Sequence, residues 1–341
     1  MKLLIADDDE ITCELLQNSL RGQAYELRHA RGKAEVLREL ENQDCRVVIA
    51  DWDFPGMNGL DLVREIRSGN FPGYIYVILI TSREGGAEMV AGLDAGADDF
   101  IRKPLDPAEL LVRIRAGERV LALETRDVAI FALARLAESR DPETGTHLER
   151  VRDYCRILAE YLGRLPTYAA EIDAEYIRLI YATSPLHDIG KVGVPDRILL
   201  KPGHLNDREY EIMKSHVELG AETLEAALGQ FPHAKFLCMA RDIAMTHHER
   251  FDGTGYPQGL KGEEIPLCGR IVALADVYDA LTSKRVYKSA YSHEVAKSII
   301  LEGTGSHFDP DVVEAFLQSE EKFLAVVSEQ EDVTAELVEM A

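Results

Sequence analysis

The sequence of 341 residues lacks several features that define special classes of protein. It has five cysteines and no CxxC pair, so we expect reduced thiols and no disulfide framework. No apolar run approaches the ~20 residues that span a bilayer, and the N-terminus turns acidic at once, so we expect no membrane insertion and no signal peptide. Basic residues are scarce, with 38 Lys and Arg against 60 Asp and Glu, giving a formal net charge of −22. Because such a surface repels nucleic acid, we expect no binding to DNA. The reduced thiols, together with the expected lack of a signal peptide and of a membrane span, favour a cytoplasmic protein.

The chain is rich enough in apolar residues, at 46%, to form sizeable cores. Its length suggests two domains, at roughly 100–200 residues each. Residues 1–115 alternate short apolar runs with amphipathic stretches, which predicts a doubly wound α/β domain with a five-stranded parallel sheet. We place this first domain at residues 1–120. The expected strands are Lys2–Ala6, Tyr25–Ala30, Arg46–Ala50, Tyr74–Ile80 and Asp98–Arg102.

Residues 108–140 have helical composition, with no proline and Gly117 as the only glycine. We expect one long helix that continues from the last helix of the first domain into the second. The alternative is two helices broken near Gly117, but a mid-helix glycine costs only about 1 kcal/mol. Beyond Asp141 the patterns are helical, so the second domain, residues 125–341, is expected to be all-α. The acidic, amphipathic segment Glu320–Ala341 is expected to end the chain as a helix.

Polar residues follow or end four of the expected strands. Asp7 and Asp8 follow the first strand, Asp51 the third, Thr81 the fourth and Lys103 the fifth. Because parallel strands end at one edge of the sheet, these side chains should converge there. Clustered carboxylates favour a hard cation such as Mg²⁺, and one of them can attack phosphorus as a nucleophile. For the neighbouring Asp9 alone, we expect a helix N-cap.

With the segment DWDFPGMNG, these residues resemble the receiver domain of response regulators over about residues 1–120. The resemblance implies a phosphoprotein in a two-component system, with a sensor histidine kinase as partner. It implies that Asp51 accepts the phosphoryl group, and that Thr81, Phe100 and Lys103 form the switch and phosphate-contacting set. The Mg²⁺ ligands that it implies are Asp7, Asp8, Asp51 and the carbonyl of Asp53. Ser82 stands where such domains more often have alanine.

A second array of possible ligands combines histidines with carboxylates. Imidazole and carboxylate together suit Fe, Mn or Zn, and eight candidates are too many for one ion. Two or three ions, with a bridging carboxylate, would suit in-line attack on phosphorus. The candidates are Glu143, His147, His187, Asp188, His216, His247, His248 and Asp276. Adjacent helical residues point about 100° apart, so His247 and His248 could bind different ions.

This array resembles the HD-GYP family, a branch of the HD phosphohydrolases, over roughly residues 125–315. The motifs are RDPETGTH, HDIGK, HHERFDGTGYP, ADVYDALTSKRVYK and GSHFDP. The resemblance implies metal-dependent hydrolysis of cyclic di-GMP to pGpG or on to GMP. It implies that His147, His187, Asp188 and Asp276 form the basic metal set, with His216, His247 and His248 completing a second site. Glu143 matches a position that accompanies a third ion in some members.

Further residues are implied to contact the substrate. Lys191 would position a phosphate or the attacking water beside Asp188, and Arg285 and Lys288 would contact substrate phosphates. The usual RPY motif has Val286 in place of proline here, which affects the placement of Arg285.

The resulting hypothesis is a response regulator whose phosphorylation at Asp51 controls a phosphodiesterase, in either direction. Apolar residues of the linker helix lie near heptad spacing, which permits a homodimer; they are Leu110, Ile114, Leu121, Val128 and Phe131. Two alternatives stay open: a cyclic dinucleotide sensor or interaction module without turnover, and a hydrolase of another cyclic dinucleotide such as cyclic GMP–AMP.

Overall fold

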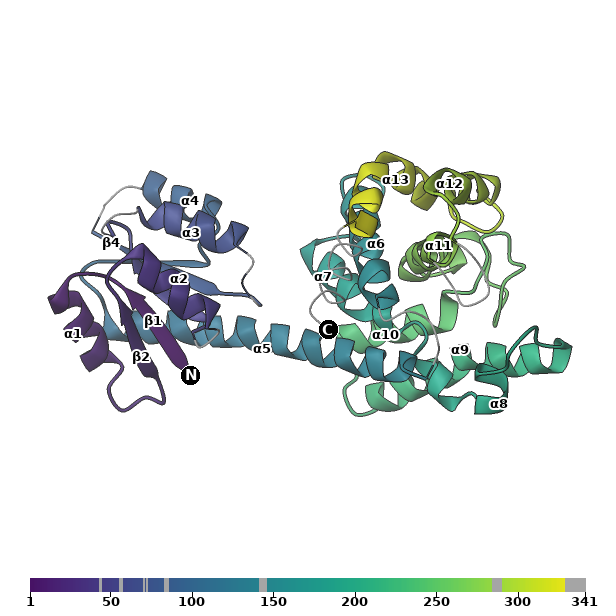
Figure 1. Ribbon diagram of the computed structural model, residues 1–341, viewed down its shortest axis with the longest axis horizontal. Coiled ribbons are helices and arrows are strands. Elements are labelled where there is room, and N and C mark those ends of the chain that lie inside the picture. The colour runs from purple at the N-terminus through teal and green to yellow at the C-terminus, as the bar shows by residue number, and fades with distance from the viewer. Residues whose placement is uncertain are drawn as a thin grey trace. The chain divides into compact units, whose positions relative to one another are not determined.

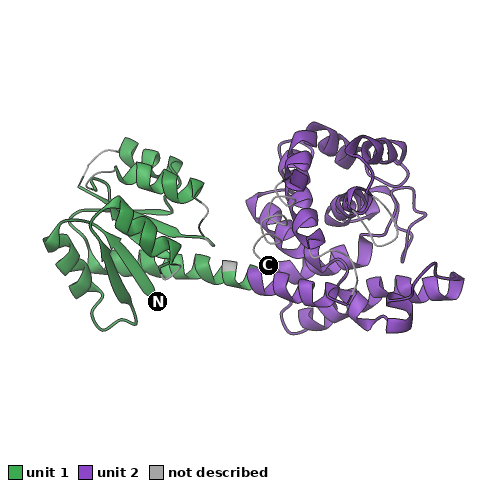
Figure 2. Cartoon of the chain, viewed as in Figure 1, with its two compact units in different colours: residues 1–127 green, residues 128–341 purple. Residues whose placement is uncertain are grey.

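The structure is a computed structural model that describes residues 1–42, 45–54, 58–69, 71, 73–82, 86–140, 146–283 and 290–328. The chain divides into two compact units, residues 1–127 and residues 128–341 (Figure 2). Each unit is described by itself below.

Unit 1 contains a parallel sheet of five strands, as the sequence pattern predicts (Figure 1). The order of the strands in the sheet is β2-β1-β3-β4-β5. The strands are β1 Lys2–Ala6, β2 Glu26–Ala30, β3 Val47–Asp51, β4 Tyr76–Thr81 and β5 Asp99–Arg102. Strands β3 and β4 each extend one residue further than expected, so Asp51 and Thr81 are their last residues.

Helices cover both faces of the sheet because alternate strand residues point to opposite sides. On one face, Leu3 and Ile5 pack with Leu16 of α1 and Ile114 of α5. On the other, Leu4 packs in a core with residues of α2 and α3. The helices are α1 Glu10–Ser19, α2 Lys33–Glu41, α3 Gly59–Ser68, α4 Gly86–Asp94 and α5 Pro107–Glu138. Asp9 caps α1, as expected, by accepting hydrogen bonds from the backbone N–H groups of Ile11 and Thr12.

Helix α5 passes Gly117 without a break. Gly117 is buried, and a Cβ there would lie 2.7 Å from the ring of Tyr76, so the glycine allows the helix to approach the sheet closely. Within unit 1, Leu110 and Ile114 of α5 join the core beneath the sheet. Within unit 2, the later residues Ile130 and Ala134 join a second core.

Unit 2 is helical, and its described residues contain no strand beyond one isolated bridge between Thr304 and Phe308. Its largest core lies among α6, α7, α11, α12 and α13. The α-helices are α6 His147–Leu162, α7 Ala174–Thr183, α8 Asp196–Leu199, α9 Asp207–Leu228, α10 Lys235–Thr246, α11 Leu267–Thr282, α12 His293–Glu302 and α13 Pro310–Gln318. Three short 3₁₀ helices are η1 Ser184–Leu186, η2 Ile189–Gly193 and η3 Gly262–Glu264. Residues 320–328 are helical, and the rest of the expected C-terminal helix lies outside the described residues.

None of the helices in the described part of the chain is both long and apolar enough to span a bilayer. All five cysteines are free thiols, as expected from their spacing.

Candidate functional site

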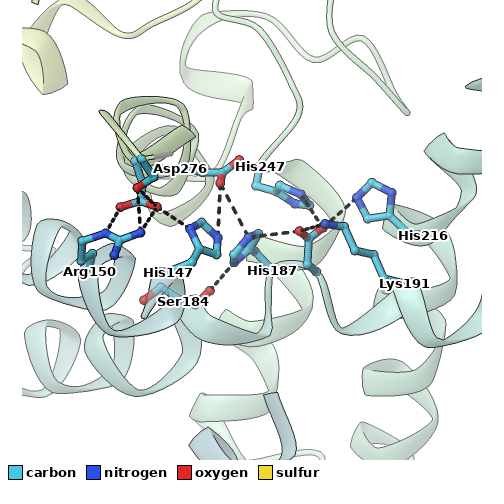
Figure 3. Close-up of polar contacts among 11 residues, drawn as sticks. His147, Arg150, Ser184, His187, Lys191, His216, His247 and Asp276 are labelled. Atoms are coloured by element: carbon cyan, nitrogen blue, oxygen red, sulfur yellow. Dashed lines mark hydrogen bonds and ion pairs between the residues drawn. The ribbon is translucent and has the colours of Figure 1, made fainter. Parts of the chain in front are cut away.

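Seven of the eight expected metal ligands come together in unit 2, in two groups. Figure 3 labels His147, His187, His216, His247 and Asp276 among them. One group is His147, His187 and Asp276. The other is Asp188, His216, His247 and His248, so the adjacent histidines lie in the same group. Within each group the ligand atoms lie within 4.8 Å of one another. The eighth candidate, Glu143, and the expected substrate contacts Arg285 and Lys288 lie outside the described residues.

Five separate segments supply these side chains. His147 is the first residue of α6, while His187 and Asp188 lie between η1 and η2. His216 lies within α9. The two remaining histidines directly follow α10, and Asp276 lies within α11. The site therefore depends on tertiary packing.

Each of four histidines has its Nδ1 atom engaged, which fixes the ring. In His187, His216 and His247, Nδ1 lies 2.7–3.1 Å from backbone carbonyl oxygens one turn earlier in the chain. A carbonyl only accepts, so Nδ1 carries a proton in each of these rings, and Nε2 is the nitrogen that can bind a metal once it is not protonated. In His147, Nδ1 lies 2.7 Å from a carboxylate oxygen of Asp279. A carboxylate behind a histidine is the usual support for a metal-binding imidazole.

The Nε2 atoms of these same four histidines are buried and have no hydrogen-bond partner among the residues that the structure describes. Oδ1 of Asp188 is buried in the same way. Leaving a buried polar atom unsatisfied costs about 1–3 kcal/mol, so five such atoms in one place are unfavourable for a purely structural cluster. Lone pairs on nitrogen and a carboxylate oxygen are what a divalent transition metal binds, so the residues fit two ions.

Asp188 lies between the two groups and is suited to bridge them. Its Oδ1 is 3.2 Å from Nε2 of His216 and 3.8 Å from Nε2 of His247. Its Oδ2 is 3.4 Å from Nε2 of His187, in the other group. Lys191 donates to the same Oδ2 at 2.8 Å, which holds the carboxylate in place.

The protonation states suit metal binding. Burial lowers the pKa of His248 to about 4, and burial and the neighbouring His248 hold the pKa of His247 well below its usual range. Burial opposes the charge of Asp188, but Lys191 and His187 keep its pKa well below its usual range. In His187, burial is outweighed by Asp188, which raises the pKa to about 9. Metal binding at neutral pH would therefore release a proton from His187.

Close packing at Gly190 holds η2 against α9. A Cβ at Gly190 would lie 1.9 Å from the carbonyl oxygen of His216 and 2.5 Å from the amide nitrogen of Gly220. Neither backbone atom can move without moving its helix. The absence of a side chain at position 190 thus lets Asp188 approach His216.

We expect Gly190→Ala to lower the metal content, and any activity that depends on the metal, by about tenfold or more, because separating the two segments by 1 Å or so disrupts the ligand set. Metal analysis of the purified variant checks this result. Gly229→Ala, at a helical glycine where the added Cβ meets only ordinary contacts of 3.4 Å or more, is the control and should retain both. Full metal occupancy in Gly190→Ala would show that this contact does not shape the site.

A third set of possible ligands is better explained as a structural network of hydrogen bonds and ion pairs than as a metal site. Its members are His293, Glu294 and Glu320. Both ring nitrogens of His293 are engaged, Nδ1 with the hydroxyl of Tyr278 and Nε2 with Glu320. Lys297 donates to both oxygens of Glu320. No lone pair of the imidazole is left for an ion.

The expected phosphoacceptor site lies at the carboxyl edge of the sheet in unit 1. Lys103 Nζ lies 2.6 Å from Oδ2 of Asp51 and 3.4 Å from Oδ2 of Asp7. Burial raises the pKa of Asp7, which is only 2% exposed. Asp8 is exposed, and the backbone N–H of Asp53 donates to Asp51 at 3.3 Å. The strand ends thus bring Asp7, Asp51 and Lys103 together as predicted.

The two expected switch residues are both buried. Thr81 ends β4 and has no exposed surface. Phe100 of β5 packs in the sheet core, with its ring edge-on to Trp52 at a centroid distance of 6.4 Å. In this arrangement the aromatic side chain points inward.

Two important residues of the metal site were not identified from the sequence. Asp279 supports His147, and Arg150 in turn donates to Asp279 at 2.9 Å. Their signal was present: Asp279 lies three residues after Asp276 and Arg150 three after His147, so each pair shares a helix face. Without the fold, neither residue could be matched to its partner.

Family models match most of the chain. One described as a response regulator receiver domain matches residues 3–115, and one described as an HD domain matches residues 132–312. The cyclic di-GMP phosphodiesterase of Thermotoga maritima is 35% identical over 362 residues, covering 97% of this chain and 94% of that protein.

Two relatives from Vibrio cholerae match the second unit. A cyclic di-GMP phosphodiesterase is 57% identical over 208 residues, 61% of this chain and 42% of that protein. The 3'3'-cGAMP-specific phosphodiesterase 2 is 42% identical over 203 residues, 60% of this chain and 36% of that protein. The chain thus spans less than half the length of these two relatives. The chain belongs to the HD-domain family, in the form in which a response regulator receiver domain precedes the HD domain.

Proposed function

We propose that this chain is a response regulator that hydrolyses cyclic di-GMP at a metal centre in its HD domain. The observation that carries the proposal is the ligand set around Asp188, with four buried, partnerless imidazole nitrogens in two groups. Relatives named cyclic di-GMP phosphodiesterases, one of them matched over nearly its whole length, support this substrate.

The proposed metal ligands are the seven residues of the two groups, with Glu143 as a candidate for a third ion. Iron or manganese suits imidazole and carboxylate together. When bound, the ions polarise the phosphoryl group and activate the water that attacks it. The protein's part is orientation: fixed Nδ1 hydrogen bonds aim each Nε2, and Asp188 holds its two oxygens toward different groups.

Lys191 is the proposed phosphate-positioning residue of this centre. Its ammonium donates to Asp188, so a positive charge lies beside the bridging carboxylate where an anionic diester must enter. Arg285 and Lys288 are proposed to contact the phosphates of the substrate, as the family resemblance implies. The expected products are pGpG, GMP or both.

Hydrolysis by protein loaded anaerobically with Mn²⁺ or Fe²⁺, followed by chromatography, tests the function. Metal-dependent formation of pGpG or GMP from cyclic di-GMP supports the enzyme. Binding of the nucleotide without product, at full metal occupancy, would instead indicate a sensor. Faster cleavage of cyclic GMP–AMP than of cyclic di-GMP would indicate the specificity named for one of the relatives.

We propose that phosphorylation of Asp51, with Mg²⁺ held by Asp7, Asp8, Asp51 and the Asp53 carbonyl, controls this activity through α5. The early part of α5 packs beneath the sheet through Leu110 and Ile114. The later part packs through Ile130 and Ala134 against Leu148 and Leu186, each next to a metal-binding histidine. A change in the receiver that shifts α5 would thus reach His147 and His187.

We expect a phosphoryl analogue such as beryllofluoride to change the hydrolysis rate of the wild-type protein at least severalfold, and to have no effect on Asp51→Asn. The reason is that Asp51 is the carboxylate that Lys103 holds at the strand edge. Rate measurements with and without the analogue give the comparison, and Asp61→Asn, an exposed carboxylate on α3, is the control. An equal response in Asp51→Asn would rule out this acceptor.

A homodimer is proposed as the working assembly, because several apolar residues of α5 are exposed, including Val112, Leu123 and Val128. A cognate sensor histidine kinase is the proposed phosphate donor. A monomeric mass in solution, both with and without beryllofluoride, would contradict the dimer.

A further inference from the structure

An aromatic and cationic surface leads outward from the metal centre and has no role in the proposed chemistry. It consists of Tyr210, Lys214 and Tyr256. Tyr210 and Lys214 lie one turn apart on the same face of α9, the helix that also supplies His216. We call these three residues the α9 ledge.

The ledge is continuous with the metal ligands. The ring of Tyr256 lies against the ring of His248, with centroids 4.9 Å apart and planes inclined by 30°. The ring of His248 in turn lies 5.2 Å from that of His216. Burial raises the pKa of Tyr256, and the Tyr210 hydroxyl, Asp188 and Asp276 act on it in the same direction.

Lys214 is held between two aromatic rings. Its Nζ lies 5.3 Å from the ring centroid of Tyr210 and 5.3 Å from that of Tyr256. Its ion-pair partner, Glu211, is 69% exposed, so water screens that pairing and leaves the ammonium able to bind another acceptor. Tyr210, at the outer end, is 50% exposed and offers a ring face to solution.

A ring face beside a fixed ammonium is suited to a nucleobase. Bases stack on tyrosine, and the lysine can donate to the O6 and N7 acceptors of guanine. Adenine offers an amino group in place of O6, so the same ammonium favours guanine. A cation is also useful here because the chain has a formal net charge of −22 while a cyclic dinucleotide is itself anionic.

We propose that the α9 ledge binds one guanine of the cyclic dinucleotide, on Tyr210 and against Lys214, while a phosphate lies at the metal centre. This inference rests on the proposed function and adds a base-recognition site to it. Tyr256, whose ring contacts both His248 and Lys214, lies between the base-binding residues and the metal centre. The ledge is therefore a determinant of substrate affinity and of base preference.

Steady-state kinetics of Tyr210→Ala and Lys214→Met, with cyclic di-GMP and with bis(p-nitrophenyl) phosphate, test the proposal. Loss of one stacked base should raise KM for cyclic di-GMP about tenfold with little change in kcat. The ratio of kcat/KM for cyclic di-GMP to that for the small diester should fall by a similar factor. Tyr210→Phe, which keeps the ring, should have the wild-type ratio. Lys214→Met should in addition reduce the preference for cyclic di-GMP over cyclic di-AMP.

Phe231→Ala is the matched control, because Phe231 is 62% exposed just beyond the other end of α9. It should retain both activities. If the ratio of kcat/KM for cyclic di-GMP to that for the small diester is unchanged in Tyr210→Ala and Lys214→Met, the α9 ledge does not bind a base. An equal loss of activity with both substrates would also refute the proposal, because it would indicate a structural role for these residues. Titration of cyclic di-GMP separates the two proposals. If cyclic di-GMP binds but is not cleaved, the proposed hydrolysis is refuted, and the Kd values of the variants still test whether the α9 ledge binds a base. If cyclic di-GMP does not bind, both proposals are refuted.

Discussion

Asp188→Ala is expected to abolish metal-dependent hydrolysis and to lower the metal content of the purified protein. Loss of an outer hydrogen-bond partner of a ligand already costs about 10–100-fold in metal affinity or activity, and Asp188 faces both ligand groups directly. Its removal leaves His187, His216 and His247 without the carboxylate that lies between them. We therefore expect a loss of activity beyond that range, measured together with metal content by elemental analysis.

The matched control for this variant is Asp207→Ala, an exposed carboxylate at the start of α9 that lies outside both ligand groups. It should retain metal and activity. Wild-type activity in Asp188→Ala at unchanged metal content would refute the assignment of Asp188 as the bridging ligand.

Asp279→Asn is expected to lower activity by about 10–100-fold, through a residue that need not touch metal or substrate. Asp279 is buried, accepts from Nδ1 of His147 and is paired with Arg150. An amide in its place removes the negative charge that makes this imidazole a stronger ligand. The buried guanidinium of Arg150 also loses its counter-charge, which costs up to about 3–5 kcal/mol of the free energy of unfolding.

A double variant separates these two effects. Asp279→Asn with Arg150→Met removes both charges, so most of the lost thermal stability should return while activity stays low. Thermal melting and hydrolysis rates are measured on the same samples. Recovery of activity together with stability would show that Asp279 acts only through folding, and that His147 does not need its support.

The fold was predictable where periodic patterns were strong. Alternating apolar runs identified the five strands, with errors of one or two residues at their ends, because strand ends depend on pairing with neighbours such as β3 with β4. Gly117 illustrates a different limit. Its low helical propensity favours a break, but close packing against Tyr76 makes glycine suitable within a continuous α5.

The candidate metal site was predictable in its chemistry and less so in its geometry. Histidine and aspartate in ordered motifs identified the candidate ligands, and the family resemblance implied two sets that differ from the observed groups only in the place of Asp188. The geometry within the groups was not accessible, because five segments meet only in the folded unit. His247 and His248 show this: helical geometry suggests different directions, yet both lie in the group of Asp188.

The most direct test of the central claim is anomalous diffraction near the manganese absorption edge, from crystals of the protein loaded with Mn²⁺ without oxygen. The account predicts one peak within the group of His147, His187 and Asp276, and another within the group of His216, His247 and His248, with Asp188 between them. A further peak near Glu143 would add a third ion to the same centre. The absence of ordered metal at both groups, at full loading of the crystals, would contradict the account.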